Sequence, residues 1–253
     1  MSPRQLATAE LLEREQRILS AAYEVMAEVG VSALTLERVS QNLPYSKGTL
    51  YNHFTCKEDL IIAMCVESIE IFEGFKERVI SFDASSRARM QALSLAYLLY
   101  AKLYPLRFML VISAKSGQIL EKASEARRNQ LLDTESRLMA LPVYHLIVPA
   151  LESGECKPPM PLAPEQIIYS CWSNAFGAIA LLEDDVRCCS IRQDMHAERE
   201  VLISINLVLD GLGWQPLSAD HDWRGEAKRA IETLFGEELK RLKQLKTPFS
   251  VDF

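Results

Sequence analysis

Residues 35–54 constrain the fold most, because two short helical patterns meet there on either side of a proline. Pro44 has no N–H group to donate and disfavours helical geometry in the residue before it, so the first helix should end there. Thr35 and Ser46 stand where each helix would begin, and their hydroxyl groups can accept hydrogen bonds from free N–H groups. The apolar residues repeat at helical spacing: Leu36, Val39 and Leu43, then Leu50 and Phe54. Two short helices with a tight turn are predicted.

The second of these helices has a polar face opposite its apolar one. That face carries one cation, several hydroxyl and amide groups and no carboxylate: Lys47, Thr49, Tyr51, Asn52 and His53. Groups of this kind can bond phosphates and the base edges of a DNA major groove. A helix-turn-helix that binds DNA is the hypothesis this face favours, and a helix-turn-helix used only for packing is the alternative.

The rest of the chain is also expected to be helical, so the predicted fold class is all-α. A helix over about 10–29, followed by Gly30, would complete an N-terminal three-helix bundle with the helix-turn-helix. A long helix from Lys57 to about residue 76 would lead into a larger helical domain. We therefore predict a DNA-binding domain over 1–55 and a second domain over 56–253. Further apolar helical segments follow, at about 86–104, 106–114, 119–141, 143–151, 164–182, 195–212 and, as a C-terminal addition, 222–246.

Composition indicates a soluble globular protein that acts without a cofactor or a membrane partner. Hydrophobic residues make up 49% of the chain, and no apolar run approaches the roughly 18 residues of a membrane span. The N-terminus has no apolar core resembling a signal peptide, so a cytoplasmic location is expected. The cysteines lack metal-site spacing, although Cys188 and Cys189, near Asp194 and His196, could instead be a metal or redox sensor. Net charge is −6 and does not by itself favour a polyanion.

The stretch Ser46–Phe54 (SKGTLYNHF), followed by Lys57–Leu60 (KEDL), resembles the DNA-binding signature of TetR-family transcriptional regulators. The family usually has glycine where Pro44 stands, and small residues where Ser40 and Leu43 stand. The resemblance implies a homodimer, most often a repressor, that a small-molecule effector releases from DNA. Its two recognition helices would read a near-palindromic double-stranded operator in half-sites about one helical turn, roughly 34–36 Å, apart.

The resemblance also assigns roles to single residues. Tyr51, His53 and Lys57 would hold phosphates, and Thr35 and Arg38 would contact the DNA backbone from the first helix. Lys47, Thr49 and Asn52 would read bases, with Lys47 suited to guanine and Asn52 to adenine. Gly48 would let the helix, capped by Ser46, approach the groove closely.

The larger domain would hold the effector and the dimer interface. By resemblance, the effector pocket lies among candidates that are mostly aromatic: Tyr97, Tyr100, Tyr104, Phe108, Met109, His145, Trp172 and Phe176. Such a lining favours a small lipophilic or aromatic effector. The helices at about 164–182 and 195–212 would form a four-helix dimer interface through apolar residues: Ile168, Cys171, Ala175, Ile179, Leu202, Ile205 and Leu209.

Two other functional classes are alternatives to a DNA-binding regulator. An enzyme is disfavoured, because there is no Gly-rich phosphate loop, no G-x-S-x-G elbow and no H-E-x-x-H pair. A helical interaction protein that does not bind DNA is the other alternative. The C-terminal helix has a basic outer face, which could lie on a membrane surface, but an added packing helix is the favoured interpretation.

Overall fold

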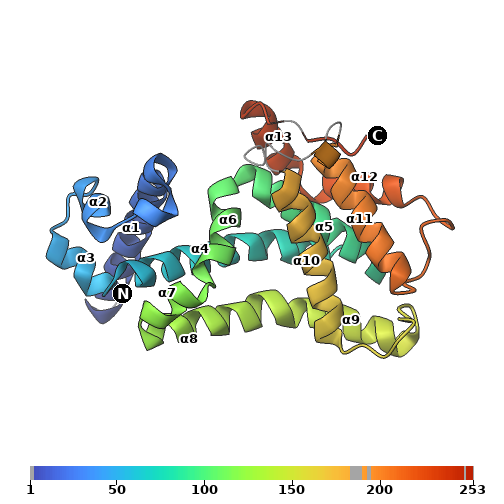
Figure 1. The fold of residues 1–253 in the computed structure, drawn as a ribbon, viewed down its shortest axis with the longest axis horizontal. Coiled ribbons are helices and arrows are strands. Elements are labelled where there is room, and N and C mark those ends of the chain that lie inside the picture. The colour runs from blue at the N-terminus through green and yellow to red at the C-terminus, as the bar shows by residue number, and fades with distance from the viewer. Residues whose placement is uncertain (1–2, 183–189, 193–194, 248, 253) are drawn as a thin grey trace. The chain divides into compact units, whose positions relative to one another are not determined.

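A computed structural model of the protein describes residues 3–182, 190–192, 195–247 and 249–252, with backbone alone at 3–8 and 191. The described residues form helices and connecting loops, which confirms the all-α fold class (Figure 1). Packing divides the chain into two compact units, Met1–Ile69 with Leu106–Thr134, and Glu70–Pro105 with Glu135–Phe253. The division differs from the predicted boundary at residue 55, because residues 106–134 pack with the N-terminal helices. Cys188, Cys189 and Asp194 lie outside the described residues.

The first unit begins with the predicted three-helix bundle. Its helices are α1 (Pro3–Ala33), α2 (Leu36–Gln41) and α3 (Lys47–His53), followed by the start of α4 (Lys57–Ile80). The main part of α1 ends at Gly30, which has the φ of 75° that glycine adopts readily. The apolar residues Leu36, Val39, Leu50 and Phe54 are buried, as predicted from their helical spacing.

Three helices from the middle of the chain complete this unit: α6 (Pro105–Ala114), α7 (Gly117–Lys122) and α8 (Glu125–Thr134). The single helix predicted over 119–141 is wrong, because the chain breaks at Ala123 and Ser124. Pro142 lies near the start of α9 (Leu141–Ser153), which follows the π-helical turn over Glu135–Ala140 without a break, so the helical course continues past this proline.

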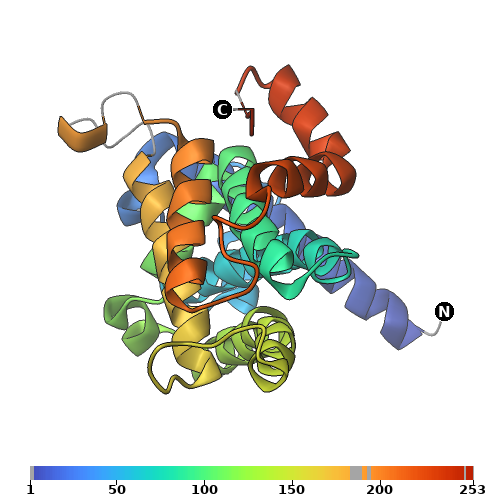
Figure 2. The ribbon, with the colours of Figure 1, turned by 90° about the vertical axis from the view of Figure 1, so that its right-hand side faces the viewer.

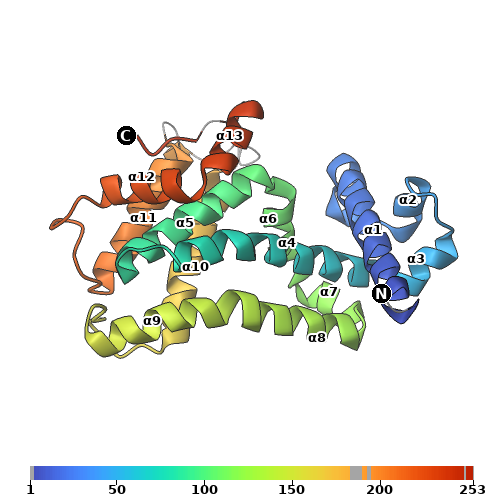
Figure 3. The same cartoon turned by 180° about the vertical axis from the view of Figure 1, so that it is seen from behind.

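The second unit contains the remaining helices. These are α5 (Ser86–Leu103), the π-helical turn η1 (Glu135–Ala140), α9, α10 (Pro164–Leu182), η2 (Ser190–Arg192), α11 (Ala197–Gly211), α12 (Trp223–Leu234) and α13 (Gly236–Gln244). Helices α10 and α11 lie side by side and both pack on α5 (Figure 2). Helix α12 packs along another part of α5, as seen from behind in Figure 3.

A buried arginine joins the start of α5 to the end of α11. The side chain of Arg87 is fully buried and donates to the carbonyl oxygen of Trp214 at 2.6 Å. It also donates to Asp210 at 2.7 Å and Asn206 at 2.9 Å. Because these partners come from the last turns of α11 and the following loop, Arg87 fixes where α11 ends relative to α5.

The C-terminal extension forms two helices instead of the single helix predicted over 222–246. Phe235 breaks the helix and is fully buried, with its ring 5.5 Å from that of Phe75. Arg78 lies over the Phe235 ring at 4.5 Å and donates to the carbonyl oxygen of Leu234 at 2.9 Å. Arg78 also pairs with Glu238 at 2.8 Å. The break between α12 and α13 thus places the Phe235 ring in the core of the second unit, against which the C-terminal extension packs.

Among the described residues, no single helix is long and apolar enough to cross a membrane. One bent pair of helices, α5 with α6, passes the same test of length and composition.

Candidate nucleic-acid interface

The two predicted caps set the orientation of the helix-turn-helix. The hydroxyl oxygen of Thr35 accepts a hydrogen bond from the N–H of Arg38 at 3.2 Å, and that of Ser46 accepts from the N–H of Thr49 at 3.2 Å. Each hydroxyl bonds an N–H group that has no partner within its own helix. With Leu50 buried beneath it, α3 presents a polar face outward.

Most of the predicted DNA-binding side chains lie on that exposed face. Lys47, Tyr51 and Asn52 are exposed, and Thr49 is half-buried. A Cβ atom added at Gly48 would meet only the hydroxyl of Ser46, at 3.7 Å. Packing within the described chain therefore does not require glycine at position 48, and the surface there is open.

Glu37 is a member of this surface that the sequence did not single out. Its carboxylate pairs with the ammonium group of Lys47, and both side chains are largely exposed. The hydrogen bond from Lys47 and its positive charge hold the pKa of Glu37 below the ordinary value. The first cation of α3 is thus paired with a carboxylate of α2, a tertiary contact that helical spacing does not reveal.

His53 does not join the exposed face. Its side chain is only 3% exposed, and its Nδ1 lies 3.6 Å from a carboxylate oxygen of Glu15 in α1. Its position near the end of α3, next to the buried Phe54, turns it toward α1. The structure therefore corrects the expectation that His53 contacts a phosphate with Tyr51.

Lys57, Thr35 and Arg38 lie at the edges of the same surface. Lys57 is half-buried, and its ammonium donates to the carbonyl oxygen of Ser32 at 2.7 Å. Thr35 and Arg38 are exposed at the start of α2. The predicted backbone contacts are thus sterically accessible, with Lys57 already anchored by one hydrogen bond.

A polar cluster joins the base of α3 to α8. Arg127 of α8 pairs with Glu15 at 2.8 Å, and its guanidinium lies over the Phe54 ring at 5.0 Å. The buried carboxylate of Asp59 accepts from the N–H of Ser124 at 2.7 Å and from the hydroxyl of Thr55 at 2.6 Å. Asp59 is thus the carboxylate that pairs with Thr55 at the start of α4.

The candidate effector residues are divided between the two units. In the second unit Tyr97 and Tyr100 are buried, with rings 5.0 and 5.3 Å from that of Phe72. In the same unit Tyr104 lies 5.4 Å from Tyr100 by ring centroids. The other candidates are distributed differently, with Phe108 and Met109 in the first unit, His145 exposed on α9, and Trp172 and Phe176 in contact with each other on α10.

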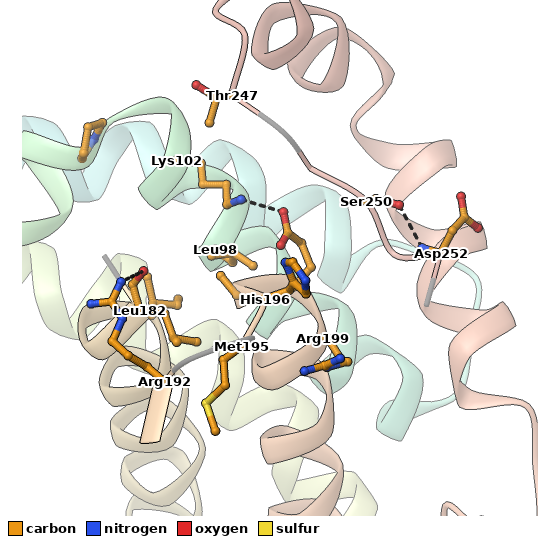
Figure 4. Close-up of a pocket in the computed structure, with 14 residues that line it drawn as sticks. Leu98, Lys102, Leu182, Arg192, Met195, His196, Arg199, Thr247, Ser250 and Asp252 are labelled. Atoms are coloured by element: carbon orange, nitrogen blue, oxygen red, sulfur yellow. Dashed lines mark hydrogen bonds and ion pairs between the residues drawn. The ribbon is translucent and has the colours of Figure 1, made fainter. Parts of the chain in front are cut away.

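A cavity of about 800 Å³ opens in the second unit among α5, α10, η2, the start of α11 and the C-terminal segment (Figure 4). Its described lining includes none of the predicted effector residues. Apolar side chains such as Leu98 and Ile179 share the wall with charged ones. Lys102 and Glu198, both in the lining, pair at 2.6 Å.

The predicted dimer residues mostly pack within the protomer. The buried ones are Cys171, Ala175, Ile179, Leu202, Ile205 and Leu209. Ile168 is half-buried. The exposed apolar side chains on the same two helices are instead Tyr169 at 65%, Leu181 at 64% and Leu207 at 68%. Helical spacing identifies apolar positions but not which of them pack within the chain.

Comparison with known proteins identifies the N-terminal region. The family model for bacterial regulatory proteins of the tetR family matches residues 18–64, which include α2, α3 and the start of α4. Residues 18–64 are therefore similar to the DNA-binding region of tetR-family regulatory proteins. An HTH-type transcriptional regulator of Staphylococcus aureus (strain USA300) is 35% identical over 92 residues, or 36% of this chain. The match spans about half, 49%, of the length of that relative.

Solved structures of bacterial transcriptional regulators share the fold over most of the chain. A tetR-family regulatory protein from Rhodococcus RHA1 has a TM-score of 0.58 at 18% identity, covering 78% of this chain and 96% of that one. FadR from Bacillus subtilis, solved in complex with stearoyl-CoA, has a TM-score of 0.59 at 16% identity, covering 78% and 98%. The ketosteroid regulator KstR2 of Mycobacterium tuberculosis has a TM-score of 0.56 at 15% identity, covering 79% and 94%. At these identities the likeness concerns the fold.

Proposed function

We propose that this protein is a cytoplasmic transcriptional regulator that binds a specific DNA operator through the exposed face of α3. The observation that carries the proposal is the capped α3, whose exposed side chains include Lys47, Tyr51 and Asn52 beside an open surface at Gly48. The family match over residues 18–64 supports it. The relatives in that match are named as transcriptional regulators, which gives the enzyme alternative no support.

The proposal assigns base reading and backbone contact to different residues. Lys47, Thr49 and Asn52 read base edges, because they project from the first two turns of α3, the part of a recognition helix that enters the major groove. Tyr51, Lys57, Thr35 and Arg38 hold the phosphate backbone and fix the register. His53 is left out of both groups because its side chain is buried.

We propose further that two copies of the chain bind one operator. The exposed Tyr169, Leu181 and Leu207 lie on α10 and α11, the pair of helices that the TetR resemblance assigns to dimerisation. Covering them with the same residues of a second copy would remove apolar surface from water. A two-fold dimer would place its recognition helices on half-sites about one helical turn, roughly 34–36 Å, apart.

Regulation by a lipophilic or aromatic effector completes the proposal, with the protein acting as a repressor. Helix α4 begins four residues after α3 ends and continues into the second unit to Ile80. An effector that binds better to a conformer with the wrong spacing of recognition helices would therefore release DNA. This part fails if a ligand stabilises the protein and leaves operator affinity unchanged.

DNA binding by the Lys47→Ala and Tyr51→Ala variants tests the main proposal. Each variant should lose affinity for a DNA sequence that the wild type selects, while circular dichroism and the melting temperature stay unchanged. Lys240→Ala serves as the matched control, because Lys240 is an exposed, ion-paired lysine of α13. Full retention of binding in both α3 variants would place the DNA contacts on other residues, and failure of the wild type to select any DNA sequence would favour the alternative of a helical interaction protein.

A further inference from the structure

Lys76 of α4 is a buried cation whose hydrogen-bonding capacity is unmet within the described chain. Its side chain has no exposed surface, and its Nζ atom has no hydrogen-bond partner among the described residues. Lysine is almost never fully buried unless it is paired, because transfer of an ammonium group from water is costly. A buried polar group without a partner therefore points to a missing acceptor.

The surroundings of Lys76 are acidic but do not supply that acceptor. Burial lowers the pKa of Lys76, while the negative charges of Glu73, Glu77 and Glu135 act in the opposite direction and only partly offset it. Glu73 and Glu77 are neighbours on α4, and Glu135 opens the π-helical turn η1. Turns of this kind occur frequently at functional sites, because they shift side chains out of the regular helical pattern.

Phe72 precedes Lys76 by one helical turn on α4, so helical spacing places the two residues on the same face of that helix. The Phe72 ring lies 5.0 Å from Tyr97 and 5.3 Å from Tyr100 by centroids. An unmet positive charge next to a cluster of rings is chemically suited to an organic anion with an aromatic or lipophilic body.

The open cavity in Figure 4 differs in this respect. Its charged groups have partners, since Lys102 pairs with Glu198 at 2.6 Å and Arg199 with Glu200 at 2.8 Å. The cavity offers volume, but its lysine and carboxylate already satisfy each other. Among the described residues of the second unit, Lys76 is a buried lysine whose ammonium group lacks a hydrogen-bond acceptor.

We propose that Lys76 anchors the effector, and that the effector is an aromatic or lipophilic molecule bearing an acidic group such as a carboxylate or sulfonate. The acidic group accepts hydrogen bonds from the Lys76 ammonium, and the apolar body packs against the rings of Phe72 and Tyr97. This inference rests on the proposed function, because it names the chemical class of the effector that the regulator senses.

A matched pair of fluorescent probes tests the inference on the full chain. 8-Anilinonaphthalene-1-sulfonate carries a sulfonate, and N-phenyl-1-naphthylamine has the same ring system without it. We expect the wild type to bind the sulfonate probe saturably and more tightly than the neutral one. Lys76→Met, which keeps the length of the side chain, should bind the sulfonate probe at least about tenfold more weakly, the loss of one charge-assisted hydrogen bond. The neutral probe should bind both proteins equally.

Lys240→Met controls for a general loss of positive charge, because Lys240 is exposed in the same unit. Equal sulfonate affinity in wild type and Lys76→Met would overturn the inference, as would a wild type that binds the sulfonate probe no better than the neutral one or binds neither.

The melting temperature gives a second test, because it should rise in Lys76→Met if Lys76 binds a ligand and should fall if the ammonium group of Lys76 holds the fold together. Without a ligand, Lys76→Met should raise the melting temperature by about 2–4 °C, because methionine has no charge to desolvate. A lower melting temperature would show that the fold needs the ammonium group, and would overturn the inference whatever the probes do. DNA binding by Lys76→Met should match the wild type. Loss of DNA binding by the wild type itself would instead refute the proposed function.

Discussion

The carboxylate of Asp59 accepts a hydrogen bond of 2.7 Å from the backbone N–H of Ser124. The two residues are 65 positions apart and lie at the starts of α4 and α8. The other carboxylate oxygen accepts from the N–H and hydroxyl of Thr55, which follows the recognition helix directly. One buried carboxylate thus joins the end of the helix-turn-helix to the helix that packs against it.

Asp59→Asn should destabilise the protein by about 1–3 kcal/mol at neutral pH, because an amide presents a donor where two donors already converge. Burial raises the pKa of Asp59, but the hydrogen bonds from Thr55 and Ser124 outweigh burial and hold it below the ordinary value. The stabilisation is therefore complete above the unfolded-state pKa, about 3.9, and is lost as the pH falls through the lower folded-state pKa. Denaturant unfolding of the wild type and Asp59→Asn from neutral pH to below the folded-state pKa measures this stabilisation. If the difference in their free energies of unfolding persists unchanged below the folded-state pKa, the stabilisation does not come from the ionised carboxylate of Asp59.

His53→Ala should reduce stability without changing how DNA affinity depends on salt. The ring is buried near Phe54 and Glu15, so its removal leaves a cavity that costs about 1–3 kcal/mol. Lys57→Ala is the comparison, and should reduce the slope of log affinity against log salt by about 0.9. Salt titrations of DNA binding distinguish the two variants. A reduced slope for His53→Ala would mean that His53 does contact a phosphate.

Among substitutions in the second unit, Arg87→Met should cause one of the larger losses in the free energy of unfolding. It leaves Asp210 without its ion-pair partner and the carbonyl of Trp214 without its donor, a loss of about 2–3 kcal/mol because Asp210 is partly exposed to water. Lys228→Met removes an exposed pair with Asp252 and should cost far less than Arg87→Met, because water screens the pair. Chemical unfolding of both variants tests the contrast. Similar small losses in the two would mean that Arg87 contributes little to the junction of α5 and α11.

Leu207→Lys should convert a dimer into monomers. Leu207 is 68% exposed, so the substitution leaves the protomer core intact but puts a charge into the proposed interface. Leu12→Lys, at a residue 59% exposed on α1, is the matched control and should remain dimeric. Sedimentation velocity gives the masses. A dimer that survives Leu207→Lys would place the interface elsewhere.

The local features of this fold were predictable from sequence, and the long-range ones were not. Thr35 and Ser46 cap their helices as expected, because a cap depends on residues three positions away. The burial of His53 depends on Glu15, and the break at Ser124 depends on Asp59, and neither partner is near in sequence. The dimer prediction selected Leu202 and its neighbours because they are apolar, although their packing within the protomer leaves Leu207 exposed.

Selection of bound sequences from a random pool of double-stranded DNA tests the central claim most directly, with the wild type and Lys47→Ala compared side by side. We expect the wild type to enrich a near-palindromic motif whose half-sites are centred about one helical turn apart. Lys47→Ala should lose the preference at one base pair in each half-site, a change of about 1–3 kcal/mol. Absence of any enriched motif with the wild type, or an identical motif with Lys47→Ala, would contradict sequence-specific reading by Lys47 at the start of α3.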